Sequence, residues 1–106
     1  RHAQREQASA ARRIRAQEFA RMLAQQLGAV DERVQRIVGF GSTFETWRTY
    51  RLDSDIDLGF IGGDWFALTA AIPPSEFEVS LVDLEEQNAE FRRHVLERGE
   101  VLYEKR

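Results

Sequence analysis

The sequence predicts an α/β (α+β) fold in which a small mixed β-sheet is flanked by helices. Apolar residues recur at helical spacing near both ends of the chain, and short runs rich in β-branched residues lie between them. This order of elements suits a sheet that is covered by helices. A chain of 106 residues has the length of one domain. We therefore expect a single domain at 1–106, with an N-terminal helix at 1–28 and a core at 34–104.

The first helix is predicted at residues 4–27. Gly28 is expected to end it, as the residue just past the C-cap. Its first turns, up to about Ala11, are rich in Ala and Arg and lack large apolar side chains. We expect those turns to project from the body or to contact a partner. The apolar stripe that would face the core consists of Ala16, Phe19, Ala20, Leu23 and Leu27.

Three strands are predicted, at 34–40, 55–61 and 77–82. The second alternates clearly, because Asp55 and Asp57 fall on the face opposite its apolar residues. Those apolar residues are Ile56, Leu58 and Phe60.

The remaining predictions concern helices and the end of the chain. A short helix is expected at 64–71, capped by its first residue. Asp83 is expected to cap the last helix, with Glu86 completing a capping-box pair. Residues 101–103 are expected to pack the tail back onto the body.

The net charge of -3 is unevenly distributed. Residues 1–51 contain ten Arg and five acids, whereas 52–106 contain five basic residues and thirteen acids. We interpret most of this as a solvated basic helix beside an acidic half; the alternative is a basic surface for an anionic ligand or an acidic partner. The sequence has no cysteine, no signal-peptide core and no run near the roughly 18 apolar residues of a membrane span. We expect a cytoplasmic protein without a membrane partner.

Asp55 and Asp57 are the first candidate chemical site. Residues two apart on a strand point to the same face, roughly 6.6–7 Å apart, so these carboxylates can share one hard cation. Mg²⁺ prefers oxygen ligands and is often held by one or two carboxylates, waters and substrate phosphates. The alternative is the polar face of an edge strand, since short acidic motifs recur by chance. Asp is disfavoured in strands, and a bound metal would compensate for two of them.

Gly41-Ser42 is the second candidate, directly after the predicted strand at 34–40. Glycine lets the backbone approach a ligand, and backbone N–H groups at a helix start bind anions. The Ser42 hydroxyl can bond a phosphate oxygen. The alternative is an ordinary turn at the end of a strand. The dipeptide Gly41-Ser42 alone does not distinguish a phosphate-binding turn from an ordinary one.

Together these motifs resemble the nucleotidyltransferase superfamily that includes DNA polymerase beta and, at this length, its minimal branch. The resemblance spans about 34–104 and is carried by Phe40-Gly41-Ser42 and by the segments 53–58, 79–84 and 99–104. It implies a nucleotidyltransferase fold with Mg²⁺ and ATP, in which Gly41 and Ser42 hold the triphosphate and Asp55 and Asp57 bind metal. In such enzymes two ions align an acceptor hydroxyl with the α-phosphate, and pyrophosphate leaves.

The chain departs from the family pattern in two places. Twelve residues separate Ser42 from Asp55, which is longer than usual, and the segment lacks the Arg and Gly usually found after the serine. Arg48 or Arg51 is the candidate for the missing phosphate contact.

The second departure is on the third strand, where the family usually has an Asp and this chain has Ser80. Glu78, two residues earlier on the same face, is the candidate third catalytic carboxylate. The alternative is a weakened or inactive site.

The leading hypothesis is a Mg²⁺-dependent enzyme that moves AMP from ATP to a hydroxyl. The chain has no room for a substrate domain, so we expect another chain to present the acceptor. The resemblance implies a helical HEPN-type toxin as that partner, with this protein as antitoxin. The second hypothesis is a module that neutralises or scaffolds a partner by contact alone, and Ser80 supports it. Transfer to a small molecule is disfavoured, nucleic acid is given little weight as a partner, and an oligomer is left open.

Overall fold

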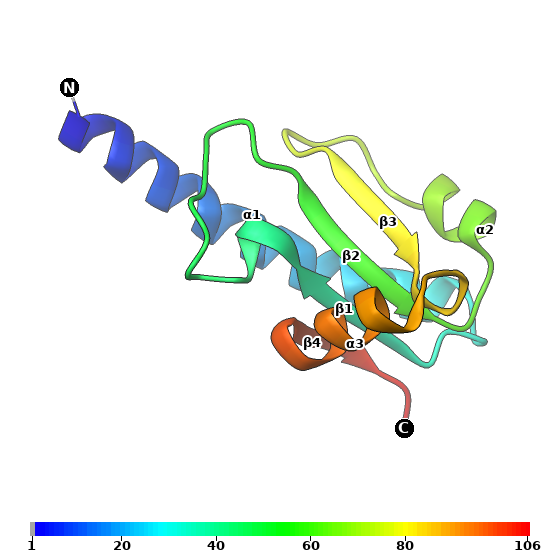
Figure 1. Ribbon diagram of the computed structural model, residues 1–106. Helices are drawn as coiled ribbons and strands as arrows, with labels where there is room; N and C mark the ends of the chain where they lie inside the picture. The colour runs from blue at the N-terminus through cyan, green and yellow to red at the C-terminus, as the bar shows by residue number, and fades with distance from the viewer. Residues whose placement is uncertain (1) are drawn as a thin grey trace.

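A four-stranded mixed β-sheet organises the structure (Figure 1). The computed structural model describes residues 2–106, with side chains from residue 3, so the first residue of the predicted domain lies outside it. The strands are β1 (Arg36–Phe40), β2 (Ile56–Ile61), β3 (Val79–Asp83) and β4 (Glu100–Glu104). Their order is β3-β2-β1-β4; β1 is antiparallel to β2 and β4, and β2 is parallel to β3. The predicted mixed sheet is confirmed, and the tail that was expected only to pack forms its edge strand β4.

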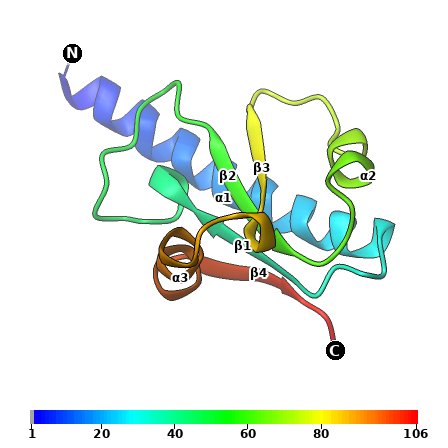
Figure 2. The ribbon, with the colours of Figure 1, turned by 45° about the vertical axis from the view of Figure 1, so that its right-hand side comes forward.

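Helices cover both faces of this sheet, and Figure 2 shows α1 and α3 on opposite sides. The long helix α1 (His2–Val30) lies along one face, and α3 (Ala89–Arg98) lies on the other. The short helix α2 (Trp65–Ala70) contacts β3 and α1. Two 3₁₀ turns, η1 (Gly41–Thr43) and η2 (Leu84–Glu86), directly follow β1 and β3. The expected α/β architecture, a small sheet flanked by helices, is therefore confirmed.

The larger part of the core lies between α1 and the sheet. The three apolar residues of β2 named above are fully buried there, which confirms the alternation predicted for that strand. Val38, Leu84 and Val95 form a smaller core on the α3 side. The neighbours Ile37 and Val38 of β1 belong to different cores, as expected for a strand whose successive side chains alternate between faces.

The end of α1 differs from the prediction, because the helix continues through Gly28 to Val30. A Cβ on Gly28 would overlap the ring of Tyr103 on β4. The glycine therefore permits close packing between helix and strand and does not end the helix. At the other end, the first turns of α1 extend past the sheet, as predicted (Figure 1). Among the described residues, no helix combines the length and the apolar character needed to cross a membrane.

The predicted helix after β3 is divided in two. Asp83 accepts from the backbone N–H of Glu85 at 3.1 Å, so it caps only the 3₁₀ turn η2. A new cap, Asn88, accepts from the N–H of Phe91 at 2.8 Å and starts α3. The extended backbone of Gln87 and Asn88 separates the two elements. The predicted cap of α2 is confirmed, since the side chain of the residue at position 64 accepts from the N–H three residues later.

Candidate active site

Asp57 lies on β2, which is a central strand of the sheet. It stands opposite Phe40 on β1 and Ser80 on β3. Its side chain is half-buried, and this burial, followed by the negative charge of Asp55, raises the pKa of Asp57 to about 6. The charge of Arg48 lowers that pKa in part. The fold therefore holds an acid in surroundings that disfavour its ionised form.

Asp55 is exposed just before β2, beside a cleft of about 630 Å³. Glu78 lines the same cleft. It lies just before β3, because this strand begins at Val79, two residues later than predicted. The N–H of Ile56 donates to the Glu78 carbonyl at 2.9 Å, and this bond extends the parallel pairing and brings Glu78 next to Asp55. Ser80 stands opposite Asp57, where the resemblance leads us to expect an acid. Among the described residues, no three acidic, His or Cys side chains are placed so that they could hold a metal by themselves.

The turn after β1 brings Gly41 against Asp57. Gly41 has a φ of +71°, a left-handed conformation that glycine adopts without steric cost. A Cβ at this position would overlap a carboxylate oxygen of Asp57. The structure thus joins the two motifs that lie far apart in the sequence. The Gly41 N–H does not face the open site, because it donates to the Glu45 carboxylate of the protein itself at 2.6 Å.

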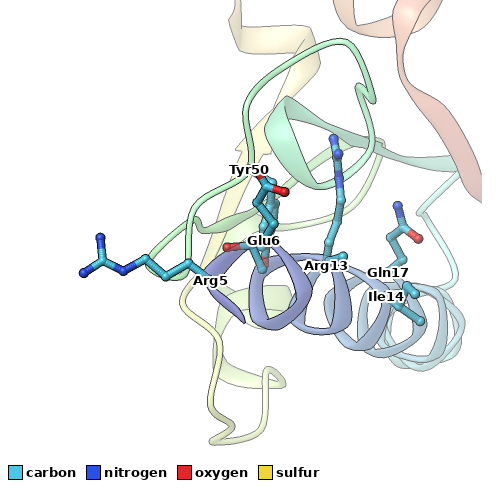
Figure 3. A pocket seen from close by; sticks show the side chains of 8 residues that line it. Arg5, Glu6, Arg13, Ile14, Gln17 and Tyr50 are labelled. Atoms are coloured by element: carbon cyan, nitrogen blue, oxygen red, sulfur yellow. The ribbon is translucent and has the colours of Figure 1, made fainter. Parts of the chain in front are cut away.

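Helix α1 holds the same turn from the other side. The Arg13 guanidinium donates to the backbone carbonyls of Ser42, Thr43 and Glu45, the last at 3.0 Å. Gln17, one turn further along α1, donates to the Thr43 carbonyl at 2.9 Å. Figure 3 shows both side chains extending from α1. These carbonyls are therefore satisfied by the protein, which fixes the backbone around the candidate phosphate turn.

Most described arginines of α1 are exposed, as the interpretation of a solvated basic helix expects, and only Arg12 and Arg13 are partly buried. Arg12 and Arg15 each lie 3.2 Å from the Glu76 carboxylate, and Arg12 also packs over the Phe77 ring. A cavity of about 590 Å³ lies between the N-terminal half of α1 and Tyr50, with Arg13 in its wall (Figure 3). This cavity is distinct from the cleft beside the carboxylates.

The structure separates the two candidate phosphate-binding arginines. Arg48, although half-exposed, lies 3.7 Å from the Glu45 carboxylate, and its charge lowers the pKa of Asp57, so it lies close to the candidate site. Arg51 is exposed in the loop before β2, where its backbone N–H donates to the Ser54 hydroxyl.

Sequence reasoning overlooked Glu45 and His94. His94 on α3 has 45% of its side chain exposed, and its Nε2 lies 3.2 Å from an oxygen of the fully buried Glu45. The two residues are 49 positions apart, and no local motif signals that they meet.

Comparison with known structures identifies two chains with the same arrangement. One is the crystal structure of a toxin–antitoxin with AMP-PNP, with a TM-score of 0.60 and 23% identity over 81% of this chain and 74% of that chain. The other is a mutant of the toxin–antitoxin MntA–HpeT, with a TM-score of 0.55 and 23% identity over 76% of this chain and 70% of that one. The chain therefore shares the fold of these two toxin–antitoxin chains. No family model and no curated protein matches the sequence.

Proposed function

We propose that this chain is the nucleotidyltransferase of a toxin–antitoxin pair and that it moves AMP from ATP to a hydroxyl of its partner. The observation that carries the proposal is the contact between Gly41 and the Asp57 carboxylate. It puts a glycine-serine turn directly beside a pair of acids, and nucleotide transfer depends mainly on positioning and on neutralising phosphate charge. ATP as substrate fits a cytoplasmic protein.

The donor atoms on β2 fit Mg²⁺. Asp55 and Asp57 both offer carboxylate oxygens, and the charge of Asp55 helps to raise the pKa of Asp57, an effect that a bound cation would oppose. The ion needs few protein ligands, since waters and substrate phosphates complete its shell. When bound, it would supply charge neutralisation on the transferred phosphate. In this proposal the Ser42 hydroxyl binds a phosphate oxygen, Arg48 adds positive charge, and Glu78 is the third carboxylate.

The comparisons support the choice of partner and substrate. One structural neighbour is a toxin–antitoxin with AMP-PNP, an ATP analogue. The other, MntA–HpeT, carries glutamate at two aspartate positions that are two residues apart, the same spacing as Asp55 and Asp57. We infer a toxin as the partner of this chain; that it is of the HEPN type follows from the sequence resemblance.

Ser80 favours a second candidate function, a module that neutralises its partner by contact alone. Ser80 stands opposite Asp57, and the described residues contain no group of three side chains placed to hold a metal. A site with only two effective carboxylates could bind nucleotide without transferring it.

A labelling experiment separates the two candidates. The protein is incubated with Mg²⁺, labelled ATP and the toxin encoded beside it, in parallel with Asp57→Ala and with the surface control Glu97→Ala. Label on the toxin that is lost in Asp57→Ala and kept in Glu97→Ala supports the enzyme. A stable complex without label in all three supports the binding module. Glu78→Gln then tests the third carboxylate, because unchanged labelling would remove Glu78 from the site.

A further inference from the structure

Glu45 is a charged side chain enclosed by the protein directly behind the candidate phosphate turn. Only 1% of its side chain is exposed. Burying a carboxylate is costly unless the group is hydrogen-bonded and paired with charge. One oxygen accepts from the Gly41 N–H at 2.6 Å, and the other lies 3.2 Å from His94 Nε2 and 3.7 Å from Arg48 Nε. These contacts account for the burial of the group and show which parts of the molecule it joins.

Glu45 binds both peptide groups of Gly41. Its side chain accepts from the Gly41 N–H, while its own backbone N–H donates to the Gly41 carbonyl at 2.8 Å. Gly41 is therefore held by Glu45 through two hydrogen bonds. It has the left-handed φ of +71° and lies against the Asp57 carboxylate. A change in Glu45 would therefore alter the placement of Gly41 relative to Asp57.

His94 connects Glu45 to the opposite layer of the fold. A carboxylate without a proton only accepts hydrogen bonds, so a hydrogen bond to it requires the His94 tautomer that carries a proton on Nε2. His94 is carried by α3, and its neighbour Val95 is fully buried in the smaller core. The packing of α3 places its backbone beside the turn, and from there the half-exposed imidazole contacts one oxygen of Glu45.

We propose that Glu45, held by His94, is a positioning residue that keeps the Gly41-Ser42 turn in the conformation that receives nucleotide phosphate beside Asp57. This inference rests on the proposed function. In this proposal the Gly41 N–H donates to Glu45 and does not bind the nucleotide, and Ser42 and Arg48 contact the phosphate. Glu45 itself does not touch the nucleotide.

Amide hydrogen exchange at Gly41, in the absence of nucleotide, tests the first half of this assignment. Glu45→Ala removes the acceptor, and we expect exchange at Gly41 to become about ten- to a hundredfold faster, the range for a lost hydrogen bond to a charged group. Glu45→Gln retains an acceptor oxygen and should have a smaller effect, and His94→Ala an intermediate one. The control Glu97→Gln removes an exposed charge from the same helix as His94 and should leave Gly41 unchanged.

The exchange rate at Gly41 is compared with that of the amide of the buried Val38. This comparison separates a local change from global destabilisation. Faster exchange at Gly41 alone supports the positioning role. Equal acceleration at Gly41 and Val38, or none at Gly41, overturns it. If Glu45→Ala does not fold, the exchange rates at Gly41 and Val38 are compared in Glu45→Gln and His94→Ala instead.

Calorimetric titration with Mg²⁺ and AMP-PNP tests the second half. We expect Glu45→Ala to bind AMP-PNP about tenfold more weakly and Glu45→Gln to lose less affinity, while the thermal unfolding of both remains cooperative. Unchanged affinity in a folded variant whose Gly41 amide has responded would overturn the link to nucleotide binding. If the wild type itself does not bind AMP-PNP, the proposed function fails, and the exchange experiment still decides whether Glu45 positions the turn.

Discussion

The contact between Gly41 and Asp57 makes a quantitative prediction about the substitution Gly41→Ala. The left-handed conformation at a φ of +71° costs a residue with a Cβ about 1–2 kcal/mol. The new methyl group would also overlap the Asp57 carboxylate, and such overpacking costs about 1–3 kcal/mol. We therefore expect Gly41→Ala to lower the free energy of unfolding by about 2–5 kcal/mol.

A double-mutant cycle separates the two contributions. In an Asp57→Ala background the carboxylate is absent, so Gly41→Ala should cost only the backbone part, about 1–2 kcal/mol. Urea unfolding of the four proteins measures each free energy. Gly63 has a φ of +96°, and its added Cβ would meet Val34 and Asp31. Gly63→Ala is thus the matched control, and its cost should be the same in both backgrounds. If Gly41→Ala costs the same with and without the Asp57 carboxylate, the two groups do not touch and the site as described is wrong.

Three further predictions concern other features of the fold. Because the pKa of Asp57 is raised to about 6, its contribution to stability should be greatest below pH about 4 and be lost as pH rises through 6. The full shift corresponds to about 3 kcal/mol, which solvent screening of this half-exposed group reduces to about 1–2 kcal/mol; urea unfolding across this pH range should show the loss, and Asp57→Asn should remove it. Gly28→Ala should lower the thermal midpoint by several degrees, because the methyl group would displace the Tyr103 ring. Hydrogen bonds to Asp31 lower its pKa, so its stabilising effect should be present above about pH 4 and lost below it, and acid titration of Asp31→Asn should lack this loss.

Local signals in the sequence were sufficient to predict most of the sheet. The alternation in β2 places its apolar side chains in the main core, and each of them is fully buried. The errors arise where tertiary contacts override a local signal. Gly28 has the character of a helix end, but its role is to admit the Tyr103 ring. The edge strand β4 has no alternation of its own and forms because β1 offers it an unpaired edge.

The candidate site was predictable only in part. Gly41 and Asp57 were identified because each belongs to a short motif, and the antiparallel pairing of β1 with β2 brings them together. Glu45 and His94 belong to no motif, and they meet only because α3 packs over the end of β1. Contacts of this kind depend on how whole elements are packed, so a single sequence does not reveal them.

The electrostatics of Asp57 agree better with the proposed ligand site than with a stabilising role. A half-buried acid beside a second acid destabilises the folded state near neutral pH, as its raised pKa records. A polar residue of similar size, such as Asn, would occupy the same space without that cost. The chain also uses Arg13, Gln17 and Glu45 to hold the adjacent turn in one conformation. A rigid turn next to unfavourably placed carboxylates makes physical sense once a cation and a phosphate join them, since the cation relieves the repulsion and the turn is already ordered to receive the phosphate.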